Sequence, residues 1–364
     1  MPKNIVVCCD GTGNEFGETN SNVIKLFSVL VQDPATQVAY YHPGLGTMGA
    51  AGALSRLSRF WTKVKGLAFG YGLADNIGDA YIYLMQTYQP GDSVYLFGFS
   101  RGAYTVRALA AMLYMYGLLR PGNEGMVRYI TRLFRGNSDN IFELAKGFKS
   151  TFSIECKPRF LGVWDTVSSV GWIYNPVKLP YTANNTDIGC VRHAISIDER
   201  RAFFRQNLWG KPAPNQDVKQ VWFAGVHSDV GGGYKEGQSG LAKITLEWML
   251  NEAAAAKLLV DDAKKKAVLG STDPNSAKPD PLGKIHKSLH GVWWLLELWP
   301  KRFWDAASKT TKWRWPLGRP RYMAPDSVVH SSVQTRIDSS KDSKNPYCPP
   351  NLPIVQDQKA AATG

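Results

Sequence analysis

The pentapeptide at residues 98–102, Gly-Phe-Ser-Arg-Gly, constrains this chain more than any other feature, because a strand-like segment precedes it and a long apolar helix follows it. The pattern G-x-S-x-G at a strand-to-helix junction is typical of a nucleophile elbow, a strained turn that needs small residues beside the serine. A helix cap made of glycine and serine could share these five residues, but it would not explain both flanks. We therefore predict that Ser100 is a nucleophile. The backbone N–H of Arg101, at the helix N-terminus, is then placed to stabilise an oxyanion.

Strand-like and helix-like segments alternate through the first 261 residues. Short β-branched runs predict strands, and longer runs with helical periodicity predict helices. The expected strands are 4–9, 37–41, 93–97, 159–164 and 218–226, and the expected helices are 22–31, 74–88, 103–119, 187–204 and 241–256. This alternation favours an α/β fold that resembles the α/β hydrolases, with a mostly parallel sheet and helices on both faces.

The chain of 364 residues is expected to form one large α/β unit with additions. Residues 1–261 are predicted to form the hydrolase core. Residues 262–325 are interpreted as a basic, Trp-rich accessory or lid segment, 326–348 as a return to the core, and 349–364 as a tail. Residues 264–323 hold 13 Lys or Arg against 4 Asp or Glu, together with six of the twelve tryptophans. Such a surface suits an anionic partner, although a solvated basic face would have the same composition.

A serine nucleophile needs a histidine base and a carboxylate that orients it. His227 follows a strand-like run and precedes small residues, which is where α/β sheets place active sites. With Asp165, which ends another strand, it completes the chain order Ser, Asp, His. The order Ser100, Asp229, His330 fits as well, and the usual placement of the acid after the strand after next favours it. The residues alone leave the two assignments open, with His330 as the alternative base.

A further constellation, Asp10-Gly11-Thr12, closes the first strand at the same edge of the sheet. The backbone N–H groups of Gly11 and Thr12 could complete an oxyanion hole. An alternative interpretation is a metal-dependent phosphoesterase in which Asp10, Asp165, His227 and Asp229 bind a divalent ion. We expect no metal and no cofactor in the preferred interpretation, where Asp10 and Asp229 support the site.

Composition excludes several classes of protein. Apolar residues make up 44% and charged residues 20% of the chain, which is incompatible with a disordered, collagen-like or coiled-coil protein. Five cysteines without a repeated spacing indicate reduced thiols. With no secretion signal or membrane-spanning run in evidence, we expect a cytoplasmic location. The net charge of +13 is not accompanied by a known nucleic-acid-binding motif, so we expect no nucleic-acid partner.

Several long motifs, in order, carry a resemblance to a known family. They are VCCDGTGNE at the N-terminus followed by TNSNV, YYHPGLGT (40–47), YQPGDSVYLFGFSRGAYTVRAL (88–109), FLGVWDTV (160–167), HAISIDERRAFF (193–204) and VWFAGVHSDVGGGY (221–234). Over residues 4 to about 337, the chain resembles the DUF2235 family of α/β hydrolases and the catalytic module of type VI secretion lipase effectors.

The resemblance implies a serine hydrolase, with phospholipase A activity in the secreted members. It assigns the nucleophile to Ser100, the acid to Asp165 and the base to His227, and so favours the first of the two assignments. A lipid or small ester is the implied substrate. For a secreted effector, delivery to another cell's periplasm and an immunity protein are implied. We expect the chain to act without the additional domain that the larger effectors carry, and a non-catalytic binding module of the same fold stays as an alternative.

The Trp-rich stretch 292–315 bears on the substrate. Trp293, Trp294 and Trp299 could insert at a membrane surface while Lys301 and Arg302 meet lipid headgroups. The alternative is that about half of the tryptophans pack on the main domain, because large aromatic side chains dominate ordinary cores.

Overall fold

A computed structural model describes residues 2–11, 17–44, 73–136, 140–167, 171–172, 175–176, 179–270, 275–291, 293–305 and 310–353. Within these ranges a seven-stranded sheet has the order β13-β10-β9-β6-β3-β1-β2, and all neighbouring strands are parallel. The strands are β1 (Asn4–Cys9), β2 (Gln37–His42), β3 (Ser93–Phe99), β6 (Pro158–Trp164), β9 (Cys190–Ser196), β10 (Asp217–Phe223) and β13 (Val328–Val329). The α/β fold predicted from the sequence is confirmed.

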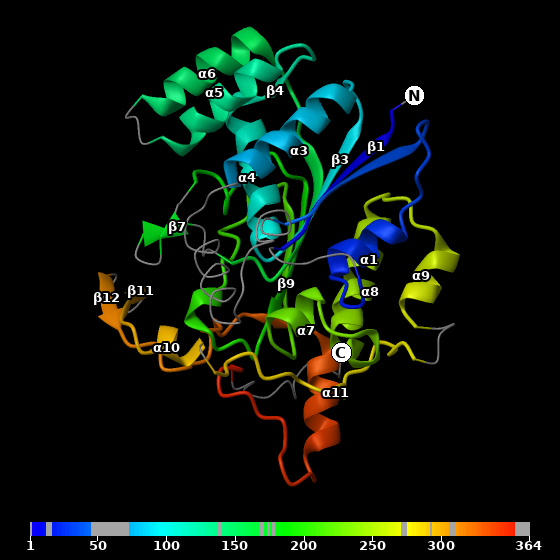
Figure 1. The fold of residues 1–364 in the computed structure, drawn as a ribbon, viewed down its shortest axis with the longest axis vertical. Helices are drawn as coiled ribbons and strands as arrows, with labels where there is room; N and C mark the ends of the chain where they lie inside the picture. Colours follow the sequence, from blue (N-terminus) through cyan, green and yellow to red (C-terminus); the bar gives the residue numbers. More distant parts are fainter. Residues whose placement is uncertain are drawn as a thin grey trace, which may run out of the picture.

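Helices cover both faces of the sheet, and the alternation of side chains along the strands explains why. In β1, Ile5 and Val7 belong to a core that includes helices α3 (Leu73–Thr87) and α4 (Arg101–Tyr116). Val6, which points the other way, belongs to a second core with α1 (Asn22–Ser28) and α8 (Gly240–Ala255). Figure 1 shows α3 and α4 on one side of the sheet and α1 and α8 on the other. Because both faces of the central strands are buried, β1 and β3 are largely apolar.

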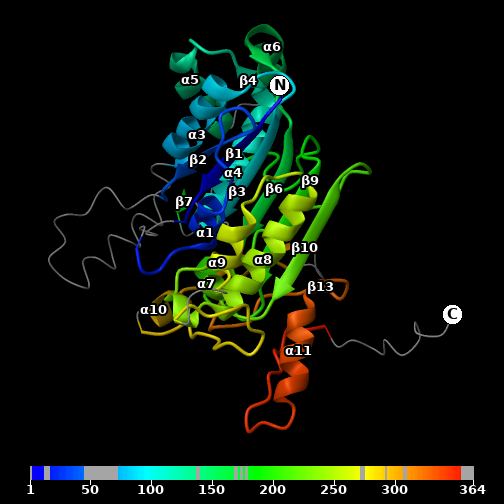
Figure 2. The ribbon, with the colours of Figure 1, turned by 90° about the vertical axis from the view of Figure 1, so that its right-hand side faces the viewer.

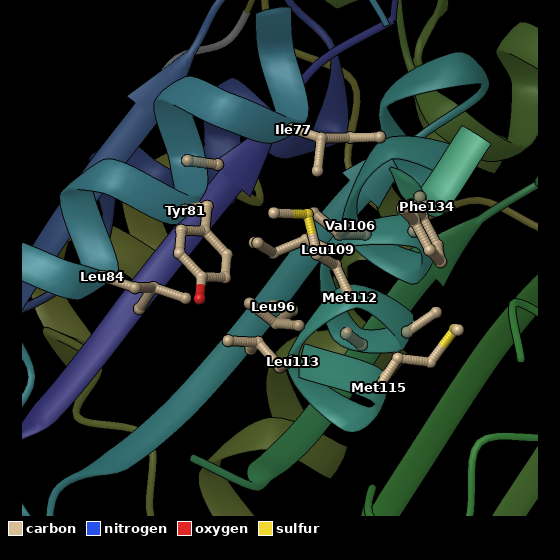
Figure 3. Packing of buried hydrophobic residues seen from close by; sticks show 14 of the residues in the cluster. Ile77, Tyr81, Leu84, Leu96, Val106, Leu109, Met112, Leu113, Met115 and Phe134 are labelled. Carbon is tan, nitrogen blue, oxygen red and sulfur yellow. The ribbon is translucent and has the colours of Figure 1, made fainter. Parts of the chain in front are cut away.

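The α3 and α4 side carries the larger buried cluster. Tyr81 and Leu84 of α3 face Leu109 and Leu113 of α4 across Leu96 of β3 (Figure 3). Helices α5 (Glu124–Arg135) and α6 (Ile141–Phe152) extend this side at the end of the sheet remote from α7 (His227–Gly231) (Figure 1). Among the described residues, no helix is long and apolar enough to cross a membrane.

Smaller elements connect or extend these layers. They are the two-stranded pairs β4 (Leu118–Leu119) with β5 (Ser153–Ile154), β7 (Gly171–Trp172) with β8 (Asn175–Pro176) and β11 (Lys301–Asp305) with β12 (Thr310–Arg314), the 3-10 turns η1 (Ala202–Phe204) and η2 (Glu236–Gln238), and helices α9 (Asp262–Val268), α10 (Trp293–Glu297) and α11 (Ser331–Ser340).

One predicted helix is wrong. The segment 187–204 contains β9, a strand between β6 and β10, and not a helix. Its polar residues suggested a half-exposed helix, but Arg192 is buried and bonded to Asp217 and Glu252. Polar side chains can be buried in a sheet when they are paired, so the mixed polarity of this segment did not indicate a helix.

After the core, the chain runs along the carboxyl ends of the strands and then returns to the sheet. Strand β13 pairs with β10, and Val333 of α11 joins Trp222 of β10 in a third buried cluster. Figure 2 shows α11 projecting away from β13, beyond the carboxyl end of β10. The described parts of the segment between, residues 275–291, 293–305 and 310–322, therefore lie where an α/β sheet places its functional site.

Candidate active site

Ser100 occupies a strained turn between β3 and α4. Its backbone has φ 58° and ψ −119°, a conformation that residues with a side chain rarely adopt. A Cβ on Gly98 would lie 2.5 Å from the carbonyl oxygen of Gly102, and a Cβ on Gly102 would lie 2.1 Å from that of Cys9. The two glycines are therefore required by close backbone approach. Ser100 Oγ makes no hydrogen bond to any described residue, and the residue is 8% exposed.

Asp165 and His227 form a direct pair beside this turn. Phe99 and Trp164 are partners in the register of β3 and β6, and the amide of Ser100 donates to the Trp164 carbonyl at 3.0 Å. Asp165, the next residue, accepts from Nδ1 of His227 with Oδ2 at 2.5 Å. The structure thus brings together the three residues to which the resemblance assigned the catalytic roles.

His227 is the first residue of α7 and is enclosed by aromatic rings. The rings of Phe99 and Phe204 lie 4.6 and 4.8 Å from the imidazole, centroid to centroid. Glu199 accepts the His227 backbone N–H at 3.2 Å. Burial lowers the pKa of His227, and the hydrogen bond that it donates to Asp165 opposes this shift. The imidazole is therefore favoured in its neutral form, which is the form that accepts a proton.

Asp165 has a second partner that the sequence did not reveal. Nη1 of Arg321 lies 2.5 Å from Oδ1, and Nη2 lies 3.0 Å from Oδ2. The Ser196 amide also donates to Oδ1, at 2.9 Å. Burial alone would raise the pKa of Asp165, but the positive charge of Arg321 and the hydrogen bond that His227 donates hold it well below its usual range. No motif marks Arg321, because it stands in an irregular Pro-flanked stretch more than 150 residues after its partner.

The turn at Asp10 supports the elbow from the other side. A Cβ on Gly102 would lie 2.5 Å from the Asp10 carbonyl, so the two turns are in contact. The Asp10 carboxylate accepts from Ser21 Oγ at 2.5 Å, from Tyr41 at 3.0 Å and from the Gly11 amide at 2.6 Å. The Gly11 N–H predicted for an oxyanion hole thus donates to Asp10 here. Thr12 lies outside the described residues.

The rival pair, Asp229 and His330, is not brought together. Nδ1 of His330 accepts from the Ser332 amide at the start of α11, and the ring stacks on Phe223. Asp229 instead accepts from Nδ1 of His286 at 2.6 Å. The layout argument for Asp229 miscounted the strands, because β9 is the strand after next beyond Ser100. It leads to Glu199 and not to Asp229.

The metal alternative required four side chains at one point. In the part of the chain that the structure describes, Asp10 bonds to Ser21 and Tyr41, Asp165 and His227 bond to each other, and Asp229 bonds to His286. The described residues contain no cluster of three or more His, Cys, Asp or Glu that could hold an ion. A guanidinium on Asp165 further disfavours a cation there.

The Trp-rich segment divides into an inner and an outer side. Trp293 packs on Phe203 and Phe204, and the guanidinium of Arg201 lies 4.9 Å from its ring. Lys301 is 8% exposed, and burial lowers its pKa to about 8. The prediction that Trp293 and Lys301 face a membrane is therefore corrected, since both pack inward.

The outer side carries the remaining predicted residues. Trp294 and Trp299 are 46% and 55% exposed, and Arg302 is exposed with its guanidinium 5.2 Å from the Trp313 ring. Further exposed apolar side chains on this segment are Leu295, Leu298, Trp313, Trp315, Leu317 and Tyr322.

The fold and site together define an α/β protein with a strained serine turn and an Asp–His pair at the carboxyl edge of a parallel sheet. Residues 3–252 match the model of the family described as the type VI secretion system (T6SS) phospholipase effector Tle1-like catalytic domain, and the chain belongs to this family. Membership supports a phospholipase-type hydrolase function.

Individual relatives are similar over parts of their length. The uncharacterized protein YEL023C of Saccharomyces cerevisiae is 37% identical over 220 residues, which is 56% of this chain and 32% of that protein. The chain thus spans about a third of this relative. A crystal structure of an uncharacterized protein from Pseudomonas aeruginosa has a TM-score of 0.46 and 18% identity, over 76% of this chain and 49% of that one. The Tle1 effector bound to the VgrG spike of the type 6 secretion system has a TM-score of 0.34 and 22% identity, over 66% and 52%.

Proposed function

We propose that this chain is a serine ester hydrolase that cleaves a phospholipid or another lipid ester through Ser100, Asp165 and His227. One observation carries the proposal: a strained serine, whose Oγ bonds to no described residue, lies at the strand end next to a buried Asp–His pair whose Nδ1 to Oδ2 distance is 2.5 Å. Family membership supports a lipid ester as the substrate. The roles of the three residues are our assignment.

The geometry suits acyl transfer. Asp165 engages Nδ1 of His227, which leaves Nε2 to accept the Ser100 proton as Oγ attacks the ester carbonyl. The Arg101 amide, in the first turn of α4, is placed to stabilise the oxyanion. The imidazolium then protonates the departing alcohol, and an acyl-serine remains. Water, deprotonated by His227, releases the acid and restores Ser100.

Covalent labelling with a fluorophosphonate tests this chemistry, with turnover of a soluble p-nitrophenyl ester measured in parallel. We expect the wild type to label and Ser100→Ala to lose both labelling and turnover. Ser239→Ala is a matched control, because Ser239 is as buried as Ser100 but precedes α8. A wild type that binds ester without labelling would support the non-catalytic module. Activity that a chelator abolishes and Ser100→Ala retains would support the metal alternative.

We also propose that the outer side of the Trp-rich segment contacts an anionic membrane. Trp294 and Trp299 supply exposed aromatic surface, and Arg302, Lys312 and Arg314 are exposed beside them. Aromatic side chains favour the interfacial region of a bilayer, and basic side chains favour anionic headgroups. Vesicle binding by variants of the two tryptophans tests this contact.

If this chain is a secreted member of the family, we propose that it is delivered to another cell and that the producing cell is protected from it. The substrate would then be reached in the periplasm of another cell, and an immunity protein would protect the producer. Expression directed to the periplasm of a bacterial host, compared for wild type and Ser100→Ala, tests the first point. Toxicity that the alanine variant retains would contradict it.

A further inference from the structure

Arg321 connects the Trp-rich segment to the acid of the triad. It lies outside residues 3–252, so the family match assigns it no role. Its guanidinium bonds both oxygens of Asp165, and Nη1 also donates to Ser196 Oγ at 2.7 Å. Its side chain is 5% exposed. A planar fork on a carboxylate fixes orientation as well as charge.

We propose that Arg321 is a positioning residue of the catalytic triad: it fixes the Asp165 carboxylate against His227 and sets the pH range in which His227 works as a base. This inference rests on the proposed hydrolase function and adds a residue to it. Arg321 acts only through Asp165 and touches no reacting atom.

The surrounding segment is built to hold Arg321 in place. Glu297, which is 1% exposed, accepts from the amides of Gly318 and Ala202 at 3.1 and 2.7 Å. The Glu297 carboxylate thus connects Gly318, three residues before Arg321, to the start of η1, which follows β9. Ser288 adds a second tie by donating to Glu199 at 3.0 Å. Nη2 of Arg321 itself donates to the Phe204 carbonyl.

The charges around His227 show what Arg321 contributes. Two carboxylates face the histidine, Asp165 through Nδ1 and Glu199 through the backbone amide. Each has its own arginine, because Arg201 bonds both oxygens of Glu199 at 2.9 Å. The positive charge on each arginine offsets the negative charge on its carboxylate.

Other titratable groups near the pair are placed differently. Asp229, on the same helix as His227, is bonded to His286. His193 of β9 faces Asp165 and accepts from the Thr166 amide, and burial lowers its pKa to about 3, which keeps it neutral. Removal of Arg321 therefore leaves the charge of Asp165 uncompensated. An uncompensated carboxylate favours the imidazolium, so His227 would need a higher pH to become a base.

The pH dependence of fluorophosphonate labelling and of kcat/KM for a soluble ester tests the proposal. We expect Arg321→Gln to move the acid limb of both profiles to higher pH by about one unit. Arg321→Lys keeps the charge and loses the fork, so its limb should stay near that of the wild type while kcat falls. Arg319→Gln removes the same charge from an exposed position on the same segment and should leave both profiles unchanged.

Acid unfolding of a destabilised variant would move the limb in the same direction, so the folded fraction of each variant is followed by circular dichroism over the same pH range. Only a shift at pH values where the variant stays folded supports the proposal. If Arg321→Gln is active with the wild-type midpoint, or if Arg319→Gln shifts it equally, the proposal is wrong. If the wild type itself neither labels nor turns over ester, the hydrolase function fails instead. If Arg321→Gln has no measurable activity, Arg321→Lys tests the proposal instead. The midpoint of its acid limb must then match that of the wild type.

Discussion

Among the described residues, two aspartate–histidine pairs are joined by short hydrogen bonds, one within the sheet core and one between the core and the Trp-rich segment. Asp165 contacts His227 at 2.5 Å, and Asp229 contacts His286 at 2.6 Å. Distance alone does not separate them. Nε2 of His286 bonds to Gln238, and its ring stacks on Tyr234 at 3.6 Å. His227 has no hydrogen-bond partner at Nε2 among the described residues, and a strained serine lies at the adjoining strand end.

The comparison teaches that a histidine is a candidate base when its Nε2 has no hydrogen-bond partner among the described residues, and that an aspartate on Nδ1 is not enough. In the second pair, both ring nitrogens of His286 are hydrogen-bonded, one to Asp229 and one to Gln238. This pair therefore has a structural role and connects α7 to the segment that carries His286. In the first pair one nitrogen stays available for proton transfer. The segment outside the family match thus supports the site from two directions, through His286 on Asp229 and through Arg321 on Asp165.

Replacement of each histidine by glutamine should break this comparison most clearly. We expect His227→Gln to lower kcat for a soluble ester by about 10⁴, because the proton acceptor is lost. His286→Gln should cost much less than the roughly 10² that general-base catalysis contributes at minimum, since no proton passes through it. Steady-state kinetics on both variants measures this.

His330→Gln serves as the control for the rejected base, because the residue caps α11 away from any described carboxylate. Equal losses in His227→Gln and His286→Gln would show that the second pair also takes part in chemistry. Loss in His330→Gln with activity kept in His227→Gln would reverse the assignment of the base.

The sequence predicted the core well and the segment poorly, for physical reasons. Strands buried on both faces give continuous apolar runs. The glycines around Ser100 stand in a short recognisable motif, although only Gly98 meets local backbone and Gly102 meets the carbonyl of Cys9 at the end of β1. Strand β9 was missed because Arg192 and His193 are buried polar residues whose partners come from elsewhere in the chain. Local pattern contains no information about such partners.

Arg321 shows the same limit more strongly. Its role depends on a contact 156 positions away in the chain, and its neighbours follow neither helical nor strand periodicity. The inward orientation of Trp293 and Lys301 was equally hidden, since composition alone does not distinguish a Trp-rich surface from a Trp-rich contact. What the sequence could supply was the chemistry of the elbow and the family motifs that chose Asp165 over Asp229.

The stability of the core should depend on acid through His193. Burial lowers its pKa from 6.5 to about 3 in the folded state. Between these values the unfolded chain binds the extra proton, so the free energy of unfolding should fall as pH falls, by about 1.4 kcal/mol per pH unit below pH 6.5. His193→Gln should remove this contribution. Urea unfolding at several pH values measures the slope for the wild type and the variant.

The Trp-rich segment offers the matched control, because His290 is exposed there. His290→Gln should keep the wild-type slope. The difference between the wild type and His193→Gln also cancels the contribution of His227, which titrates in both. A His193→Gln slope equal to that of the wild type would mean that the acid sensitivity does not arise from this buried position.

The smallest effect, and the sharpest test of how the two regions differ, concerns the outer tryptophans. Trp294 of α10 and the nearby Trp299 are 46% and 55% exposed, whereas Phe142 is 55% exposed on α6, which lies at the opposite end of the molecule from α10 (Figure 1). We expect the double change Trp294→Ala, Trp299→Ala to weaken binding to vesicles containing phosphatidylglycerol by about tenfold, which corresponds to about 0.7 kcal/mol for each ring and so to partial insertion. Turnover of a soluble ester should be unchanged, because neither side chain contacts the triad.

Phe142→Ala should leave vesicle binding intact, and pure phosphatidylcholine vesicles should bind all variants weakly. Equal losses from both ends would mean that general surface hydrophobicity, and not the Trp-rich segment, holds the protein on the membrane.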